Sequence, residues 1–157
     1  MLGLFSVPLT CDTTRPRAHY LFRSFVRDIE SASLRIDDPS KNTTVLAPLN
    51  SAIEKLPRKP WEDPRDYGAL GPNAYEGGDG QERAQRNLQR FVEAHLVPVG
   101  IWQEGEKVKT LLGDRDIWWE VKDGQRLLQP GDIEVVNVAK TVANGEVWIL
   151  RAARNYA

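Results

Sequence analysis

The sequence of 157 residues has a single cysteine, Cys11, so an internal disulfide is impossible. Its 2 histidines, His19 and His95, stand at no metal-ligand spacing with Cys11, and we expect no metal ion and no cofactor. An excess of charge is also lacking. The 21 basic and 22 acidic residues leave a net charge of −1, which gives nucleic-acid binding little electrostatic support. No segment approaches the roughly 20 apolar residues of a membrane-spanning helix.

Catalytic groups are scarce as well. Cys11 has no partner base that the sequence indicates, and no glycine-flanked serine elbow occurs. Asp63 and Asp66 lie beside prolines, which is typical of turn residues rather than of an acid–base pair. The glycine-rich stretch GALGPNAYEGGDG lacks the lysine of a phosphate-binding loop. We therefore predict that the chain is not an enzyme.

Targeting signals point in two directions. The opening MLGLFSVPL is apolar, but it lacks a basic start, contains Pro8 and precedes no small-residue cleavage pattern, so it is a poor signal peptide. Either the chain is not secreted, or a leader was removed before this sequence begins. In contrast, Asn42-Thr43-Thr44 is an N-glycosylation acceptor, which has meaning only in a secretory compartment. Asn42 is thus a candidate glycosylation site.

What is present is enough for one packed core, since 41% of the residues are apolar and five of them are tryptophans. We expect a single domain over residues 1–157, with residues 1–13 as an N-terminal extension. Apolar residues at helical spacing predict a helix over 20–29, and the turn residues DDPS at 37–40 stop it. Residues 44–46 favour a short strand that Pro48 ends. A short helix follows at once, with Asn50 or Ser51 as its cap.

The middle of the chain, residues 58–80, has so many prolines and glycines that we expect a long surface loop, inserted into the domain. Trp61, Tyr67 and Tyr75 predict that aromatic side chains hold this loop against the body. A second helix is expected over 81–97, where Pro98 and Gly100 stop it. The remainder has the alternation and the Asp-Gly and Asn-Gly turns of antiparallel strands, expected over 107–112, 116–122, 125–129, 133–139 and 146–152.

Two adjacent tryptophans, Trp118 and Trp119, lie within one of these strands. Successive side chains of a strand point to opposite faces, so at most one of the two indoles belongs to the core. The other is covered either by the aromatic loop, which we favour, or by a bound partner.

Three motifs resemble the fasciclin (FAS1) domain family, and the resemblance covers most of the chain. The family's Thr-Val-Phe-Ala-Pro-Thr-Asn-x-Ala-Phe motif is similar to TVLAPLNSAI; the identical positions are Thr44, Val45, Ala47, Pro48, Asn50 and Ala52. The family's Tyr-His segment is similar to FVEAHLVP, with His95 present and Ala94 in place of the aromatic residue. Its closing Asn-Gly motif is matched at Asn144 and Gly145. The long loop and the segment NGEVWIL are similar to fungal members.

The resemblance implies an α+β fold, a wedge-shaped antiparallel β-sandwich of about seven strands with helices packed along one edge. It also implies a non-enzymatic adhesion or interaction module that binds a protein or glycan partner at a cell surface, cell wall or secretory compartment, such as the vacuole. The candidate partner-binding residues are Phe91, His95, Leu96 and Trp118, and we expect a monomer. For His95 the alternative is an imidazole that is hydrogen-bonded inside the fold.

A second function stays open, namely an apolar small-molecule carrier for a carotenoid- or lipid-like ligand. It predicts a pocket of several hundred Å³ that is lined by aromatic side chains.

Overall fold

The computed structural model of the chain describes residues 20–100, 102–113, 115–142 and 145–154. The expected N-terminal extension, with Cys11 and His19, lies outside these residues. Within them the helices, in chain order, are α1 (Tyr20–Asp28), α2 (Glu30–Asp37), α3 (Asn50–Glu54), α4 (Pro64–Leu70) and α5 (Gly77–Glu93). The strands are β1 (Thr43–Pro48), β2 (Leu96–Val97), β3 (Val108–Lys109), β4 (Asp116–Lys122), β5 (Gln125–Gln129), β6 (Ile133–Val142) and β7 (Gly145–Leu150). The α+β class is confirmed.

The described strands form one 7-stranded sheet in the order β2-β1-β7-β6-β5-β4-β3. Neighbours are antiparallel except for β1 and β7; the sequence predicted this for the strands of the C-terminal third but not for β1 and β2. These two strands run parallel, in a register that extends from Thr43 opposite Gly145 to Pro48 opposite Leu150. The hairpin signals did not indicate this pair because they report only on strands that are adjacent in the sequence.

All six residues of β1 are buried. Its apolar side chains belong alternately to two apolar clusters. Val45 and Ala47 pack in a cluster with α1 and α5, together with Val147 and Ile149 of β7. Leu46 belongs to the second cluster. Because neighbouring side chains of a strand point to opposite faces, β1 is the layer that separates the two cores.

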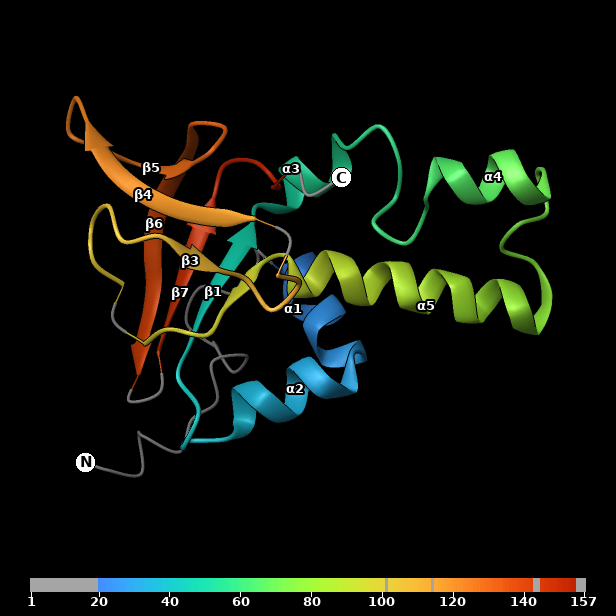
Figure 1. The fold of residues 1–157 in the computed structure, drawn as a ribbon, viewed down its shortest axis with the longest axis horizontal. Helices are drawn as coiled ribbons and strands as arrows, with labels where there is room; N and C mark the ends of the chain where they lie inside the picture. Colours follow the sequence, from blue (N-terminus) through green and yellow to red (C-terminus); the bar gives the residue numbers. More distant parts are fainter. Residues whose placement is uncertain (1–19, 101, 114, 143–144, 155–157) are drawn as a thin grey trace.

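The second cluster lies inside the curve of the sheet and is built around Trp148. The indole of Trp102 stacks on that of Trp148 at 5.2 Å between ring centroids, and Trp119 meets it edge-on at 5.8 Å. The sheet therefore bends so that β4 and β5 face β1 and β7 across these rings, nearly as in a barrel (Figure 1). Helices α1, α2 and α5 lie on the other side of β1.

The corner after β1 has the predicted form. The strand ends at Pro48 and α3 begins at Asn50, with the N–H of Leu49 donating to the carbonyl of Leu150 at 2.9 Å. The predicted side-chain cap is wrong, since neither Asn50 nor Ser51 caps α3 and Leu49 stands at the N-cap position. The Asn50 Oδ1 instead accepts a hydrogen bond from the N–H of Leu21 in α1. The corner is thus tied to the first helix.

Two helix predictions need correction. The first predicted helix is interrupted: α1 ends at Asp28, the next residue, Ile29, has an extended conformation, and a separate helix, α2, runs to Asp37. The second begins earlier, at Gly77, and ends at Glu93 rather than at residue 97. Leu96 and Val97 leave the helix because they pair with Val45 and Thr44 on the free edge of β1, where both become fully buried.

Residues 58–80 are more regular than the predicted loop. They contain α4, which Asp63 caps by accepting a hydrogen bond from the N–H of Arg65 at 2.8 Å. Pro64 stands at the first helical position, where its missing N–H costs nothing. The Asp-Pro pair was the signal for this helix, and the density of breakers around it obscured that signal.

Gly145 provides a test of the parallel pair. Its φ of 144° is outside the range that other residues favour, and an added Cβ would overlap the carbonyl oxygen of Thr43. We expect Gly145→Ala to lower the free energy of unfolding by at least about 2 kcal/mol, measured by urea denaturation. The control is Gly68→Ala in α4, where a Cβ meets no atom within 4 Å and the free energy of unfolding should stay the same or rise by up to about 1 kcal/mol. Equal stability of the two variants would contradict the close approach of β1 to β7.

Candidate functional site

Three of the four predicted partner-binding residues lie in the interior. Phe91 is 2% exposed, and His95 and Leu96 are fully buried. Phe91 and Leu96 belong to the core between the helices and the sheet. In this fold a partner at the surface does not contact these side chains, because α5 and β2 turn them toward the core. The buried position of His95 agrees with the alternative of an imidazole that is hydrogen-bonded inside the fold.

His95 joins the end of α5 to the residues that follow β7. Its Nδ1 lies 2.8 Å from the carbonyl oxygen of Phe91, and its Nε2 accepts a hydrogen bond from the N–H of Arg154 at 3.0 Å. A carbonyl only accepts, so Nδ1 carries the proton and the ring is the neutral tautomer. The guanidinium of Arg154 also donates to the carbonyl of Ala94 at 2.7 Å. The histidine therefore holds two distant segments together.

Trp118, the fourth candidate, is half-buried on the outer face of β4, whereas Trp119 is in the core. The prediction that the two side chains point to opposite faces is thus confirmed. The prediction that the aromatic loop covers Trp118 is wrong. The ammonium group of Lys107 lies over the Trp118 ring at 5.1 Å, while the aromatic loop turns elsewhere: Trp61 contacts Phe25 of α1.

Asn42 is exposed, just before β1. Its carbonyl accepts a hydrogen bond from the Arg35 guanidinium at 2.9 Å, while Thr44 of the same acceptor triplet is buried and donates to the carbonyl of Val99 at 2.7 Å. The acceptor amide is therefore on the surface of the folded chain.

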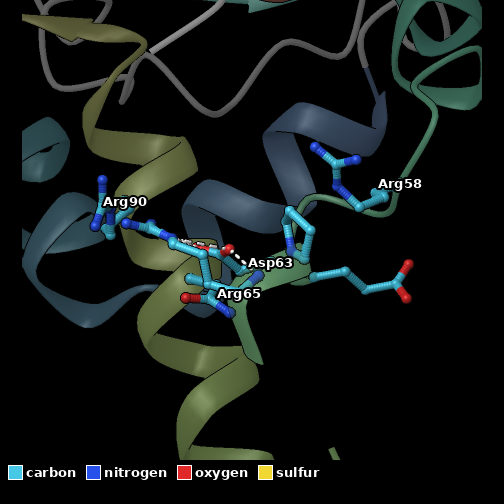
Figure 2. A pocket seen from close by; sticks show the side chains of 7 residues that line it. Arg58, Asp63, Arg65 and Arg90 are labelled. Atoms are coloured by element: carbon cyan, nitrogen blue, oxygen red, sulfur yellow. Dashed lines mark hydrogen bonds and ion pairs between the residues drawn. The ribbon is translucent and has the colours of Figure 1, made fainter. Parts of the chain in front are cut away.

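A pocket that the sequence did not reveal lies between α4 and the C-terminal half of α5 (Figure 2). Its volume is about 410 Å³. The lining residues are Arg58, Glu62, Asp63, Pro64, Arg65, Asn87 and Arg90. These residues are spread over two segments, so only the docking of α4 on α5 brings them together.

Asn87 of α5 is the main link between the two segments. Its buried side-chain amide lies within hydrogen-bond distance of the Trp61 carbonyl, the Asp66 carboxylate and the Tyr75 hydroxyl, at 3.0–3.1 Å. The Tyr75 hydroxyl donates in turn to Asp66 at 2.8 Å and accepts from the N–H of Asp63 at 2.6 Å. The predicted aromatic anchoring is thus present, and it is largely a polar network.

The carboxylates of this region are held in the ionised form. A hydrogen bond from the Tyr67 hydroxyl is the main reason why the pKa of Glu62 is lowered. The side chain of Arg65 does the same for the pKa of Asp63, and that of Asn87 for the pKa of Asp66. The hydrogen bond to Glu62 raises the pKa of Tyr67 to about 12. At neutral pH the three carboxylates are therefore negatively charged and Tyr67 keeps its proton.

Among the residues that the structure describes, no group of histidine, cysteine, aspartate and glutamate side chains is arranged to hold a metal ion. Each of the helices described is too short or too polar to cross a bilayer.

Comparison with known proteins identifies the family. A FAS1 domain-containing protein of Neurospora crassa is 65% identical over 153 residues, which are 98% of this chain and 67% of the relative. The chain belongs to the FAS1 domain family. Similar FAS1 domain-containing proteins from Aspergillus fumigatus and Emericella nidulans are 53% and 48% identical; the match covers 89% and 90% of this chain, and 60% and 59% of theirs. No family model matches the chain.

The fold is that of a solved FAS1 structure. A FAS1 domain pair from the insect cell adhesion molecule Fasciclin I matches with a TM-score of 0.62 at 11% identity, over 98% of this chain and 52% of that one. The predicted FAS1 fold and the predicted likeness to fungal members are both confirmed.

The role of His95 in this FAS1 domain can be tested by mutation. His95→Ala leaves the N–H of Arg154 without its acceptor and opens a cavity beside Phe91, so we expect a loss of about 2–4 kcal/mol in the free energy of unfolding. His95→Asn and His95→Gln each reproduce one ring nitrogen and should fall between the wild type and His95→Ala in urea denaturation. Unchanged stability of His95→Ala would contradict the structural role.

Proposed function

We propose that this FAS1 domain is a non-enzymatic interaction module that binds a protein or glycan partner at a cell surface, a cell wall or within the secretory pathway. Family membership supports the general role, because the related Fasciclin I is a cell adhesion molecule. The chemistry supports the absence of catalysis. The one described histidine uses both ring nitrogens inside the fold, and the carboxylates of the arginine-lined pocket are held ionised.

The outer face of β4 and β5 carries the side chains that support this proposal best. Trp118 stands there opposite Gln129, and Leu127 of β5, opposite Glu120, lies diagonally from it. Gln129 is fixed by a hydrogen bond to Glu120 at 3.1 Å. An aromatic side chain with an apolar neighbour and a polar rim is typical of a contact surface.

Lys107 does not prevent contact with Trp118. A cation over a half-buried indole contributes on the order of 1 kcal/mol, so a partner that stacks on the ring can displace the ammonium group at small cost. The Lys107 side chain then becomes free to pair with an acidic group of the partner.

The carrier alternative has no comparable support. The pocket between α4 and α5 is lined mainly by charged side chains. A second hollow, beside Trp61 and Leu88, is lined otherwise by Gln81, Ala84 and Gln85. Three of the tryptophans pack on one another in the core instead of lining a cavity.

The contact surface is tested with Trp118→Ala. We expect this variant to lose at least about tenfold in affinity for the partner that the wild type captures from cell-surface or wall extract, because stacked aromatic side chains dominate such contacts. The affinity is measured with the purified partner, and the fold of each variant is checked by circular dichroism. The control is Leu34→Ala, which removes an exposed apolar side chain on α2 and should bind normally. Equal binding by wild type and Trp118→Ala would refute the assignment.

The compartment is tested at Asn42. If the chain passes through the secretory pathway, protein purified from its own organism should exceed the sequence mass by one N-glycan, and Asn42→Gln should abolish the difference. Asn42→Gln is the suitable variant because Thr44 is buried and hydrogen-bonded, so replacing Thr44 would also disturb β1. An unmodified mass for protein from that source would contradict glycosylation of Asn42.

A further inference from the structure

The pocket between α4 and α5 contains more positive charge than its own carboxylates neutralise. Arg58 precedes α4, Arg65 lies in α4 and Arg90 in α5, and all three line the hollow. Two lining residues, Glu62 and Asp63, are acidic. In Figure 2 the side chains of Arg65 and Arg90 extend to one side of the pocket and Arg58 lies on the other.

Both carboxylates already use their oxygens within the protein. The Asp63 carboxylate accepts hydrogen bonds from the Arg65 guanidinium at 2.6–3.1 Å, and its Oδ1 also accepts from the N–H of Arg65. One oxygen of Glu62 accepts from the N–H of Lys59 at 2.9 Å, and the other from the Tyr67 hydroxyl. Little acceptor capacity is left for a bound cation.

Two of the three lining arginines, Arg58 and Arg90, are in the opposite state. In the part of the chain that the structure describes, the guanidinium groups of Arg58 and Arg90 form no hydrogen bond and no ion pair with protein groups. Each guanidinium offers five N–H donors in a planar fork that matches two oxygens of one anion. The hollow therefore presents unused donors and positive charge from two sides.

The size of the hollow bears on the kind of ligand. Its 410 Å³ fall within the range of small-molecule sites, roughly 300–1,000 Å³. A bare oxyanion is comparable to a few water molecules of about 30 Å³ each and would leave most of this space unfilled. Between the charged groups, much of the lining surface is formed by side-chain carbon atoms, so the rest of the ligand needs apolar as well as polar surface, as a sugar ring has.

We propose that this pocket binds an oxyanion ester, a phosphate or a sulfate, carried on a polar ligand of about the size of a sugar. Arg58 and Arg90 bind the ester oxygens, and the ion pair with Asp63 holds Arg65 beside them. The inference goes beyond the interaction-module function, since it concerns a different surface from Trp118 and needs no partner protein. Either proposal can fail while the other stands.

The test is a titration of the isotope-labelled chain with glucose 6-phosphate, glucose 6-sulfate and glucose, followed by NMR. We expect saturable shifts of the amides of residues 58–66 and 86–91 with one or both esters, and none with glucose. The ester that binds more tightly identifies the oxyanion. Binding of glucose as tightly as the esters, shifts elsewhere in the chain, or no saturation through the millimolar range would overturn the proposal.

Variants separate the pocket from general charge attraction. Arg58→Gln and Arg90→Gln should each weaken ester binding by about tenfold or more, because each removes a charged bidentate donor. The matched control is Arg27→Gln, which removes the same charge from an exposed position on α1 and should bind within about twofold of the wild type. Arg65 is left unchanged because its ion pair with Asp63 supports the start of α4. An equal loss in all three variants would show non-specific attraction and overturn the assignment.

Discussion

The parallel pairing of β1 with β7 is the interaction on which the rest of the structure depends. A strand that is buried along its whole length must satisfy its backbone on both edges, and β1 does so with β7 on one side and β2 on the other. Its alternate side chains then supply two cores at once, Val45 and Ala47 on the helical side and Leu46 on the tryptophan side. A defect in β1 would therefore reach both halves of the domain.

The two candidate surfaces follow from this arrangement. The edge of β1 draws Leu96 and Val97 into the sheet, which ends α5 at Glu93 and turns His95 toward the core. The part of α5 before this point remains free to bind α4 through Asn87, and this contact creates the arginine pocket. In β4, Trp119 packs into the tryptophan core inside the curved sheet, so the neighbouring Trp118 lies on the outer face.

Local patterns predicted much of the fold. Helical spacing located α1, Pro48 located the corner, and the alternation rule placed Trp118 and Trp119 on opposite faces. Non-local pairing decided what those patterns missed. The local pattern predicts a helix at Leu96 and Val97, because their pairing with the edge of β1 is not visible in the sequence. No local signal indicates that β1 lies beside β7. The arginine pocket was missed for the same reason, because Arg58 and Arg90 are far apart in the sequence and only the fold brings them together. The sequence motif did indicate His95, but this residue lies in the interior.

Hydrogen–deuterium exchange of single amides tests the central position of β1 most directly. The N–H of Leu46 is bonded to the carbonyl of His95 and that of Leu49 to the carbonyl of Leu150, so both should exchange only through global unfolding of the domain. The amides of the β4–β5 hairpin, nearer to solvent, should open at lower free energy. If Leu46 and Leu49 exchanged as fast as that hairpin, β1 would not be the strand that unites the two cores.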